Sequence, residues 1–445
     1  MVTLSNRHSR WTLPMLACAL VNFLAAQGLM LGGASWPWQS VSADGTLAAV
    51  HLLVIGWLLM LMLAALFQFV PVITARALPS QRLALATFIA LEAGLAGMVC
   101  GFFGLGHSPA LTLALPVGGS AVVLGVALAL WNLSVPLLGT RGLTLPGRIL
   151  LSAECFLVLT LGLGLTFTLA FAVPSLTPSL APLLYAVGDH ALAGLGGWFT
   201  LSAMGVSYKL LPMFMLAPED RGLTGDVVHL LASLGFALLI GAGLTRTWTA
   251  SHWLRILQSS GEVAVVIAIA IFLWDILRIY RARQRPLLEA HNRAAVGAFT
   301  LLGLSAVGTI GLSATGRLEQ DAPLLVYGAV FGWLGGLGLT QLYKIIPFLT
   351  WLSRYGQRLG REPVPRVQDL VCESRAYRWF ALYFLGVLLT SVAVLRDETV
   401  GLRFALAWVA LATLGLIREY WRAWRAHYPG ICQARSRPTP IIADP

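Results

Sequence analysis

The sequence predicts an all-α integral membrane protein with twelve transmembrane helices. Of its 445 residues, 58% are hydrophobic and only 11% are charged, and the mean hydropathy is +0.79. About a quarter of the residues in a soluble domain are charged, so this chain lacks the polar side chains that a water-facing surface needs. These observations exclude a soluble enzyme and a nucleic-acid-binding protein. The net charge of +11 is instead attributed to basic loops, which fix the orientation of the chain in the membrane.

Twelve apolar runs in the sequence predict twelve transmembrane helices. A helix needs about 20 mostly apolar residues to cross the hydrocarbon core of a bilayer. The runs fall at 13–33, 47–70, 82–103, 110–135, 149–172, 183–215, 226–245, 257–280, 294–313, 322–350, 375–395 and 401–422. No other stretch is long and polar enough for a separate soluble domain. Residues 1–445 are therefore predicted to form a single polytopic membrane domain, with a tail at 423–445.

The basic residues predict the orientation of the chain. Of the 30 Lys and Arg residues, 25 fall on the side of the N-terminus, the even-numbered loops and the tail. Positively charged loops stay in the cytoplasm, so both termini are predicted to be cytoplasmic, in a bacterial inner membrane. The first apolar run has no small-residue cleavage site and is interpreted as a retained helix rather than a signal peptide.

A Gly-Trp pair recurs in three predicted helices, and each tryptophan lies fourteen residues before a proline. The copies are Gly56-Trp57 with Pro71, Gly197-Trp198 with Pro212, and Gly332-Trp333 with Pro347. The tryptophans are 141 and 135 residues apart, about four helices each time. The spacing predicts three parallel four-helix units, at about 13–135, 149–280 and 294–422, around a pseudo-threefold axis. The alternative is that these residue types are simply common at the ends of membrane helices.

This architecture resembles subunit I of the haem–copper oxidase superfamily. The stretches HLLVIGWLLMLMLAALFQFVP (51–71) and HALAGLGGWFTLSAMGVSYKLLPMFMLAP (190–218) are similar to segments of oxidase-subunit-I-like and NnrS-type membrane proteins. The resemblance implies that His51 matches the second-helix ligand of the low-spin haem and that His190 matches the sixth-helix copper ligand. Where the family has a His-His pair this chain has only His252, and where its tenth helix has histidines this chain has Tyr327. These departures predict that the protein does not reduce oxygen.

Four of the eight histidines fall at or near the predicted outer face. Neutral imidazole binds haem iron, copper and zinc, so His51 and His190 are candidate cofactor ligands. His107, His190 and His252 are candidate metal ligands. The alternatives are interhelical hydrogen bonds for His51 and His190 and solvated loop positions for the other two. His51 lies six residues before its tryptophan and His190 eight, so the sequence leaves open whether their rings face each other.

Two acidic residues are candidates for a proton or ion path. Glu92 lies about ten residues into the third predicted helix, roughly 15 Å deep and near the bilayer centre. A charge there costs at least ~2.5 kcal/mol on insertion scales. Glu92 is therefore protonated, hydrogen-bonded across helices or part of such a path. Glu262 lies nearer the outer face and could join the histidines.

The predicted function is haem b binding, copper binding or both, through outer-side histidines. The role would be in electron transfer, in nitric-oxide or metal stress, or in respiratory assembly. The expected partners are the lipid bilayer and another membrane subunit or an electron-donor protein, and a homo-oligomer is compatible with the sequence. One alternative is a transporter or permease for a metal ion or small solute. Another is an oxidase or nitric-oxide reductase with unusual ligands, so enzyme activity is left open. The five cysteines form no CxxC or CxxCH motif, which predicts no c-type haem.

Overall fold

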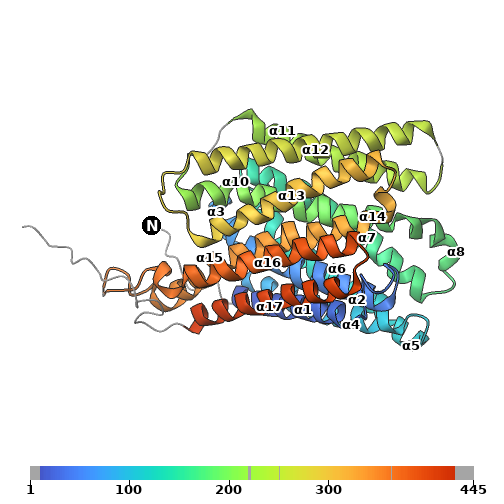
Figure 1. The fold of residues 1–445 in the computed structure, drawn as a ribbon, viewed down its shortest axis with the longest axis horizontal. Coiled ribbons are helices and arrows are strands. Elements are labelled where there is room, and N and C mark those ends of the chain that lie inside the picture. The colour runs from blue at the N-terminus through green and yellow to red at the C-terminus, as the bar shows by residue number, and fades with distance from the viewer. Residues whose placement is uncertain (1–10, 219–221, 250, 362, 426–445) are drawn as a thin grey trace, which may run out of the picture.

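The computed structural model describes residues 11–218, 222–249, 251–361 and 363–425. Every regular element among these residues is a helix. Eleven helices are long and apolar enough to cross a membrane, and the long helices run side by side along the longest axis of the molecule (Figure 1). The prediction of an all-helical, multi-span membrane protein in a lipid environment is confirmed. Most of the predicted tail at 423–445 lies outside the described residues, because α17 is described only to Arg425.

The helices follow the predicted order. The first third contains α1 (Thr12–Leu31), α2 (Asp44–His51), η1 (Leu52–Leu59), α3 (Met60–Thr74), α4 (Gln81–Gly104), α5 (Pro109–Thr112) and α6 (Ala114–Leu138). The second contains α7 (Leu145–Ala172), α8 (Thr177–Leu180), η2 (Ala181–Ala186), α9 (Val187–Leu192), η3 (Ala193–Thr200), α10 (Leu201–Met215), α11 (Leu223–Arg246) and α12 (His252–Arg281). The last contains α13 (Ala290–Ala314), α14 (Leu318–Tyr327), η4 (Gly328–Gly335), α15 (Gly336–Tyr355), η5 (Val367–Leu370), α16 (Glu373–Leu395) and α17 (Thr399–Arg425).

The continuous stretch from α9 to α10, at 187–215, is one more long helix. It is not among the eleven most apolar helices, because its glycines, serines, histidine and lysine lower its hydropathy. Several helices also extend beyond their apolar runs: α7 begins at Leu145 and α15 continues to Tyr355. A helix satisfies its own backbone groups, so it can continue into the headgroup region, where polar side chains reach water.

Three eight-residue π-helical segments contain the repeated Gly-Trp pairs: η1, η3 and η4. Each glycine allows the first helix of its own third to pack closely against the π-helical segment. A Cβ would lie 2.7 Å from the Asn22 side chain at Gly56, 2.4 Å from Phe156 at Gly197 and 2.8 Å from Leu301 at Gly332. The three tryptophans are at most 1% exposed. The repeated residues therefore have the same packing role in each third.

The helix contacts recur in the same way along the chain. The last two long helices of each third pair with one another: α4 with α6, α11 with α12, and α16 with α17. The segment η4 contacts both η1 and η3, so the three π-helical segments meet inside the bundle. The short helices α5 and α8 lie at one end of the bundle (Figure 1). The end with α5 and α8 is the one predicted to face outward, and it is called the outer end below.

Candidate cofactor site

A cavity of about 470 Å³ lies in the outer half of the bundle. It is bounded by the three helices that contain the π-helical segments, and α6 and α7 contribute further walls. Its lining is almost entirely apolar, with residues such as Leu53, Val122, Leu161 and Phe331. Both His51 and His190 line it, so the structure brings the two candidate cofactor ligands to one place.

His51 is the last residue of α2 and is partly buried. Its Nδ1 lies 2.8 Å from the carbonyl oxygen of Leu47, one helical turn earlier. A carbonyl can only accept, so Nδ1–H donates this bond and the unprotonated Nε2 keeps its lone pair. The Phe102 ring of α4 packs against the imidazole at a centroid distance of 4.6 Å.

His190 lies in α9 and has the same hydrogen-bonding pattern with a different partner. Its Nδ1 lies 3.0 Å from the carbonyl oxygen of Thr160, which belongs to α7. Phe167 of α7 contacts the ring edge-on at 5.4 Å. Gly164, one turn after Thr160, leaves room for the imidazole, because a Cβ at this position would lie 3.0 Å from the His190 Cε1 atom. His190 therefore depends on the neighbouring helix for its orientation.

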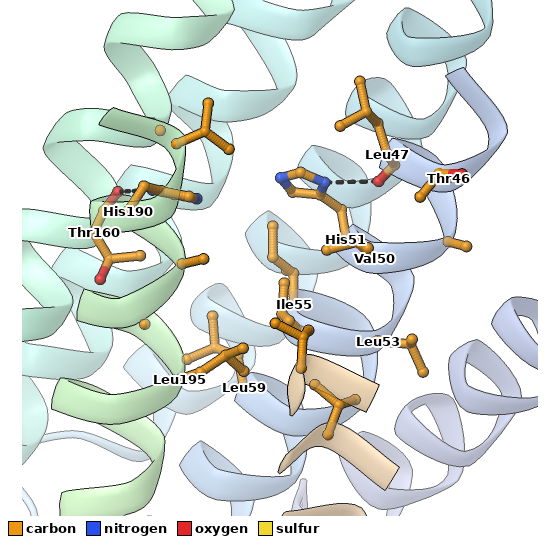
Figure 2. Close-up of a pocket in the computed structure, with 18 of the residues that line it drawn as sticks. Thr46, Leu47, Val50, His51, Leu53, Ile55, Leu59, Thr160, His190 and Leu195 are labelled. Atoms are coloured by element: carbon orange, nitrogen blue, oxygen red, sulfur yellow. Dashed lines mark hydrogen bonds between the residues drawn. The ribbon is translucent and has the colours of Figure 1, made fainter. Parts of the chain in front are cut away.

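The two imidazoles point toward one another from opposite walls of the cavity (Figure 2). The sequence left this arrangement open, because the two histidines differ by two residues in register and two residues turn a helical side chain by about 200°. Leu192, the residue of α9 equivalent to His51, is not among the residues that line the cavity, whereas His190 is.

The third helix at the cavity contributes Tyr327, which occupies the position equivalent to His51. Its ring stacks on Phe331 at 4.7 Å and contacts Trp36 at 5.7 Å. The side chains that line the cavity include no Cys, Asp or Glu and no third histidine. The site therefore offers two imidazole ligands in apolar surroundings.

His107 and His252 are not brought to this cavity. His107 is exposed, with its Nε2 3.9 Å from a carboxylate oxygen of Asp44. His252 begins α12 on the surface, where the Arg255 guanidinium donates to its Nδ1 at 3.3 Å. Across the described parts of the chain, no group of three or more His, Cys, Asp and Glu could hold a metal ion. The predicted metal ligands His190, His252 and His107 thus do not form one cluster.

The two acidic candidates also lie outside the cavity lining. Glu92 is half-buried on α4, and the Asn22 side chain of α1 donates to its Oε1 at 3.0 Å. Glu262 is half-buried on α12, and Gln258 one turn earlier donates to it at 3.2 Å. Glu262 is not among the residues around His51 and His190.

A buried ion pair lies at the opposite end of the bundle, between Glu289 and Lys344. The Lys344 Nζ is 2.5 Å from the Glu289 carboxylate, which is 9% exposed. Arg285 and Gln368 also donate to this carboxylate. Burial alone would raise the pKa of Glu289. The Lys344 ammonium and the nearby His291 and Arg285 instead hold it below its ordinary value near 4.5.

Some residues of the site could not be identified from the sequence. The carbonyl groups of Leu47 and Thr160 orient the histidines, and backbone acceptors carry no residue-type signal. The one available signal was the Leu-Gly-Leu-Gly-Leu run at 161–165, which contains Gly164. No family model matches the chain, and no curated protein sequence matches it.

Proposed function

We propose that the protein holds one haem b between His51 and His190 and uses it for electron transfer. The observation that carries this proposal is the pair of imidazoles on opposite sides of one apolar cavity, each with Nδ1 bonded to a backbone carbonyl. Metal-binding histidines characteristically donate their second ring nitrogen to such an acceptor, which fixes the tautomer and the ring orientation.

The donor set fits haem better than copper. A porphyrin supplies four nitrogen ligands itself, so the protein needs to add only axial ligands. A copper or zinc ion bound by protein side chains usually needs three or four of them. The cavity lining has two imidazoles and no thiolate or carboxylate. Copper, the other predicted cofactor, would need a further donor, for which the lining offers the thioethers of Met30 and Met98.

The volume and the lining of the cavity also suit a flat, mostly apolar ligand. Cofactor pockets typically occupy about 300–1,000 Å³ and have mostly apolar walls. Glycines from three different helices line this one: Gly119, Gly164, Gly188 and Gly194. Positions without side chains allow a flat ring system to lie close to helix backbones.

The bound haem would supply reversible one-electron chemistry. His51 and His190 would hold the haem, and the apolar walls would exclude water. With both histidines holding the haem, electron transfer would be favoured over oxygen reduction. The partner would then be a one-electron donor or acceptor protein, or another membrane subunit.

The scaffold proposed for this site is that of haem–copper oxidase subunit I, with three four-helix units around a pseudo-threefold axis. The support comes from the equivalent π-helical segments and from the matching glycine contacts at Gly56, Gly197 and Gly332. The third unit has Tyr327 in place of a histidine. The bias to arginine, with only Lys209 and Lys344 as lysines, favours a bacterial inner membrane, and the distribution of the basic residues favours cytoplasmic termini.

The test is an absorption spectrum and a haem-to-protein ratio for protein purified from a haem-replete host. We expect a Soret band, about one haem b per chain, and the spectrum of two-imidazole ligation. His51→Ala and His190→Ala should each lose most of the haem. His107→Ala and His252→Ala are matched controls, since these outer-end histidines lie outside the cavity lining.

The proposal fails if the purified wild type contains no haem, or if the two cavity variants keep it unchanged. Size-exclusion profiles of all four variants separate loss of haem from loss of fold. If metal analysis finds neither iron nor copper, the transporter alternative is tested by uptake of metal ions into proteoliposomes, with Glu92→Gln as the variant.

A further inference from the structure

A polar pair midway along α1 and α4 connects these two helices to the π-helical segment η1. The Asn22 Nδ2 atom donates to Glu92 Oε1 at 3.0 Å and lies 3.4 Å from the carbonyl oxygen of Gly56. Gly56 makes this approach possible, because a Cβ there would lie 2.7 Å from the Asn22 side chain. Asn22 therefore joins the Glu92 carboxyl to the helix that contains His51.

Helix packing does not require a polar residue at this position. The residues that contact the equivalent glycines are Phe156 at Gly197 and Leu301 at Gly332. An apolar side chain thus fills the same role in the other two thirds of the chain. Of these three equivalent positions, only the one in the third that contains Glu92 has an asparagine. We therefore attribute the Asn22 amide to its hydrogen bond with the Glu92 carboxyl.

Few charges surround Glu92. On α1, Cys18 lies one turn before Asn22 and faces the same carboxyl. On α4 itself, Arg82 and Cys100 lie toward the two ends, and α2 contributes Asp44 and His51 near its outer end. The other packed elements α3, α5, α6 and η1 have no titratable side chain. A carboxylate without a cation is costly at this depth, so the neutral acid is favoured.

We infer that Glu92, which is half-buried at the surface of the bundle, is a proton-binding site. The hydrogen bond from Asn22 holds the Glu92 carboxyl beside the helix that contains His51. The amide donates to one carboxyl oxygen, and the other carries the proton. Ile89, one turn before Glu92, is 58% exposed on the lipid-facing side of α4. The ligand of the site is thus a proton. An apolar reagent can reach the Glu92 carboxyl from the lipid.

The helix α4 also connects this site to the cavity. Beyond Glu92 it contributes Met98 to the cavity lining, and Phe102 contacts the His51 ring. Ten residues of helix place Glu92 within about 15 Å of this contact. At an effective dielectric constant of about 20, a charge on Glu92 would change a redox equilibrium at the cavity about sixfold. This last step rests on the proposed haem.

The direct test uses dicyclohexylcarbodiimide on the intact purified protein, followed by peptide mass spectrometry. The reagent takes the proton of a neutral carboxylic acid on nitrogen and adds the carboxyl oxygen to its central carbon, so the product is a simple adduct. We expect Glu92 to be modified. Glu154 is the internal control, since it is 8% exposed and accepts a hydrogen bond from Ser134 at 2.6 Å. Absence of the Glu92 adduct, or faster modification of Glu154, overturns the inference.

Infrared spectroscopy tests the role of Asn22. The wild type should show a carboxylic-acid C=O band that disappears in Glu92→Gln. Asn22→Leu, which resembles the Leu301 arrangement and should fold, should shift this band to higher wavenumber because the C=O loses its donor. Ser134→Ala is the matched control and should shift only the Glu154 band. A Glu92 band that is unchanged in Asn22→Leu contradicts the inference.

A redox titration tests the connection to the cavity. We expect the midpoint potential of the haem to vary with pH in the wild type and to lose this dependence in Glu92→Gln. If the protein contains no haem, the proposed function fails, but the carbodiimide and infrared results still decide the proton site. If haem is present and both proteins titrate alike, the proton site is not coupled to the cofactor.

Discussion

His51 and His190 face each other across one cavity, but the two rings are oriented by different parts of the fold. The Nδ1 of His51 donates to Leu47 in its own helix, whereas the Nδ1 of His190 donates to Thr160 of α7. The first bond forms with the helix itself, and the second requires α7 and α9 to pack correctly. The geometry of the site is therefore most sensitive to changes in α7.

Gly164→Ala should weaken haem binding. The new Cβ would lie 3.0 Å from His190 Cε1 and would displace the imidazole. We expect a lower haem content and an altered Soret band in the purified protein. Gly162→Ala on the same helix is the control, because a Cβ there has no neighbour within 4 Å. Equal haem content in the two variants would contradict the proposed role of His190.

His190→Met should retain some haem and raise its midpoint potential. Methionine can ligate haem iron, and axial methionine in place of histidine raises the potential. The measurement is a redox titration of the variant beside the wild type. An unchanged potential and spectrum would mean that His190 is not an axial ligand.

Gly197→Ala should destabilise the fold. Its Cβ would lie 2.4 Å from Phe156, and overpacking of this kind typically costs about 1–3 kcal/mol. Thermal unfolding in detergent would show a lower midpoint. Gly241→Ala, at a position without neighbours within 4 Å, should be neutral or slightly stabilising, since alanine is the better helix former. If both variants unfold like the wild type, the close approach of α7 to η3 is not needed.

Glu289→Gln should destabilise the protein at neutral pH. The change leaves the Lys344 ammonium without its carboxylate, and breaking a buried pair costs about 3–5 kcal/mol, less where one partner stays partly exposed. Lys344 is 19% exposed, so we expect a loss on the order of 2–3 kcal/mol. Asp226→Asn is the control, because its pair with Arg148 is nearly half exposed on both sides.

The same ion pair predicts how stability depends on pH. The pKa of Glu289 is lower in the folded protein than its ordinary value near 4.5. Such a carboxyl stabilises the fold above its unfolded pKa, and this stabilisation is lost as the pH falls through the folded pKa. The unfolding midpoint of the wild type should therefore approach that of Glu289→Gln below pH 4.5. A constant difference between the two proteins at all pH values would contradict this.

The apolar runs predicted the helices well because a bilayer imposes a length and a composition on each crossing. The helix ends were less predictable. The helix α12 begins at His252, five residues before its apolar run. Hydrophobicity marks the hydrocarbon core, whereas the backbone hydrogen bonds that define a helix continue into the interface. The π-helical segments gave no signal of their own, although the Gly-Trp motif marked their positions.

The sequence by itself determined that this chain crosses a membrane many times, and it identified His51, His190 and Glu92 as candidate functional residues. The membrane crossings and Glu92 follow from the energy of transferring side chains into lipid, which depends on local composition, and the histidines follow from the metal-binding chemistry of imidazole and from the resemblance. Only the tertiary structure decided that His51 and His190 share a cavity that excludes His107 and His252, and that Glu92 has Asn22 as its partner. Those relationships join residues 70 to 139 positions apart, and they depend on which helix faces meet.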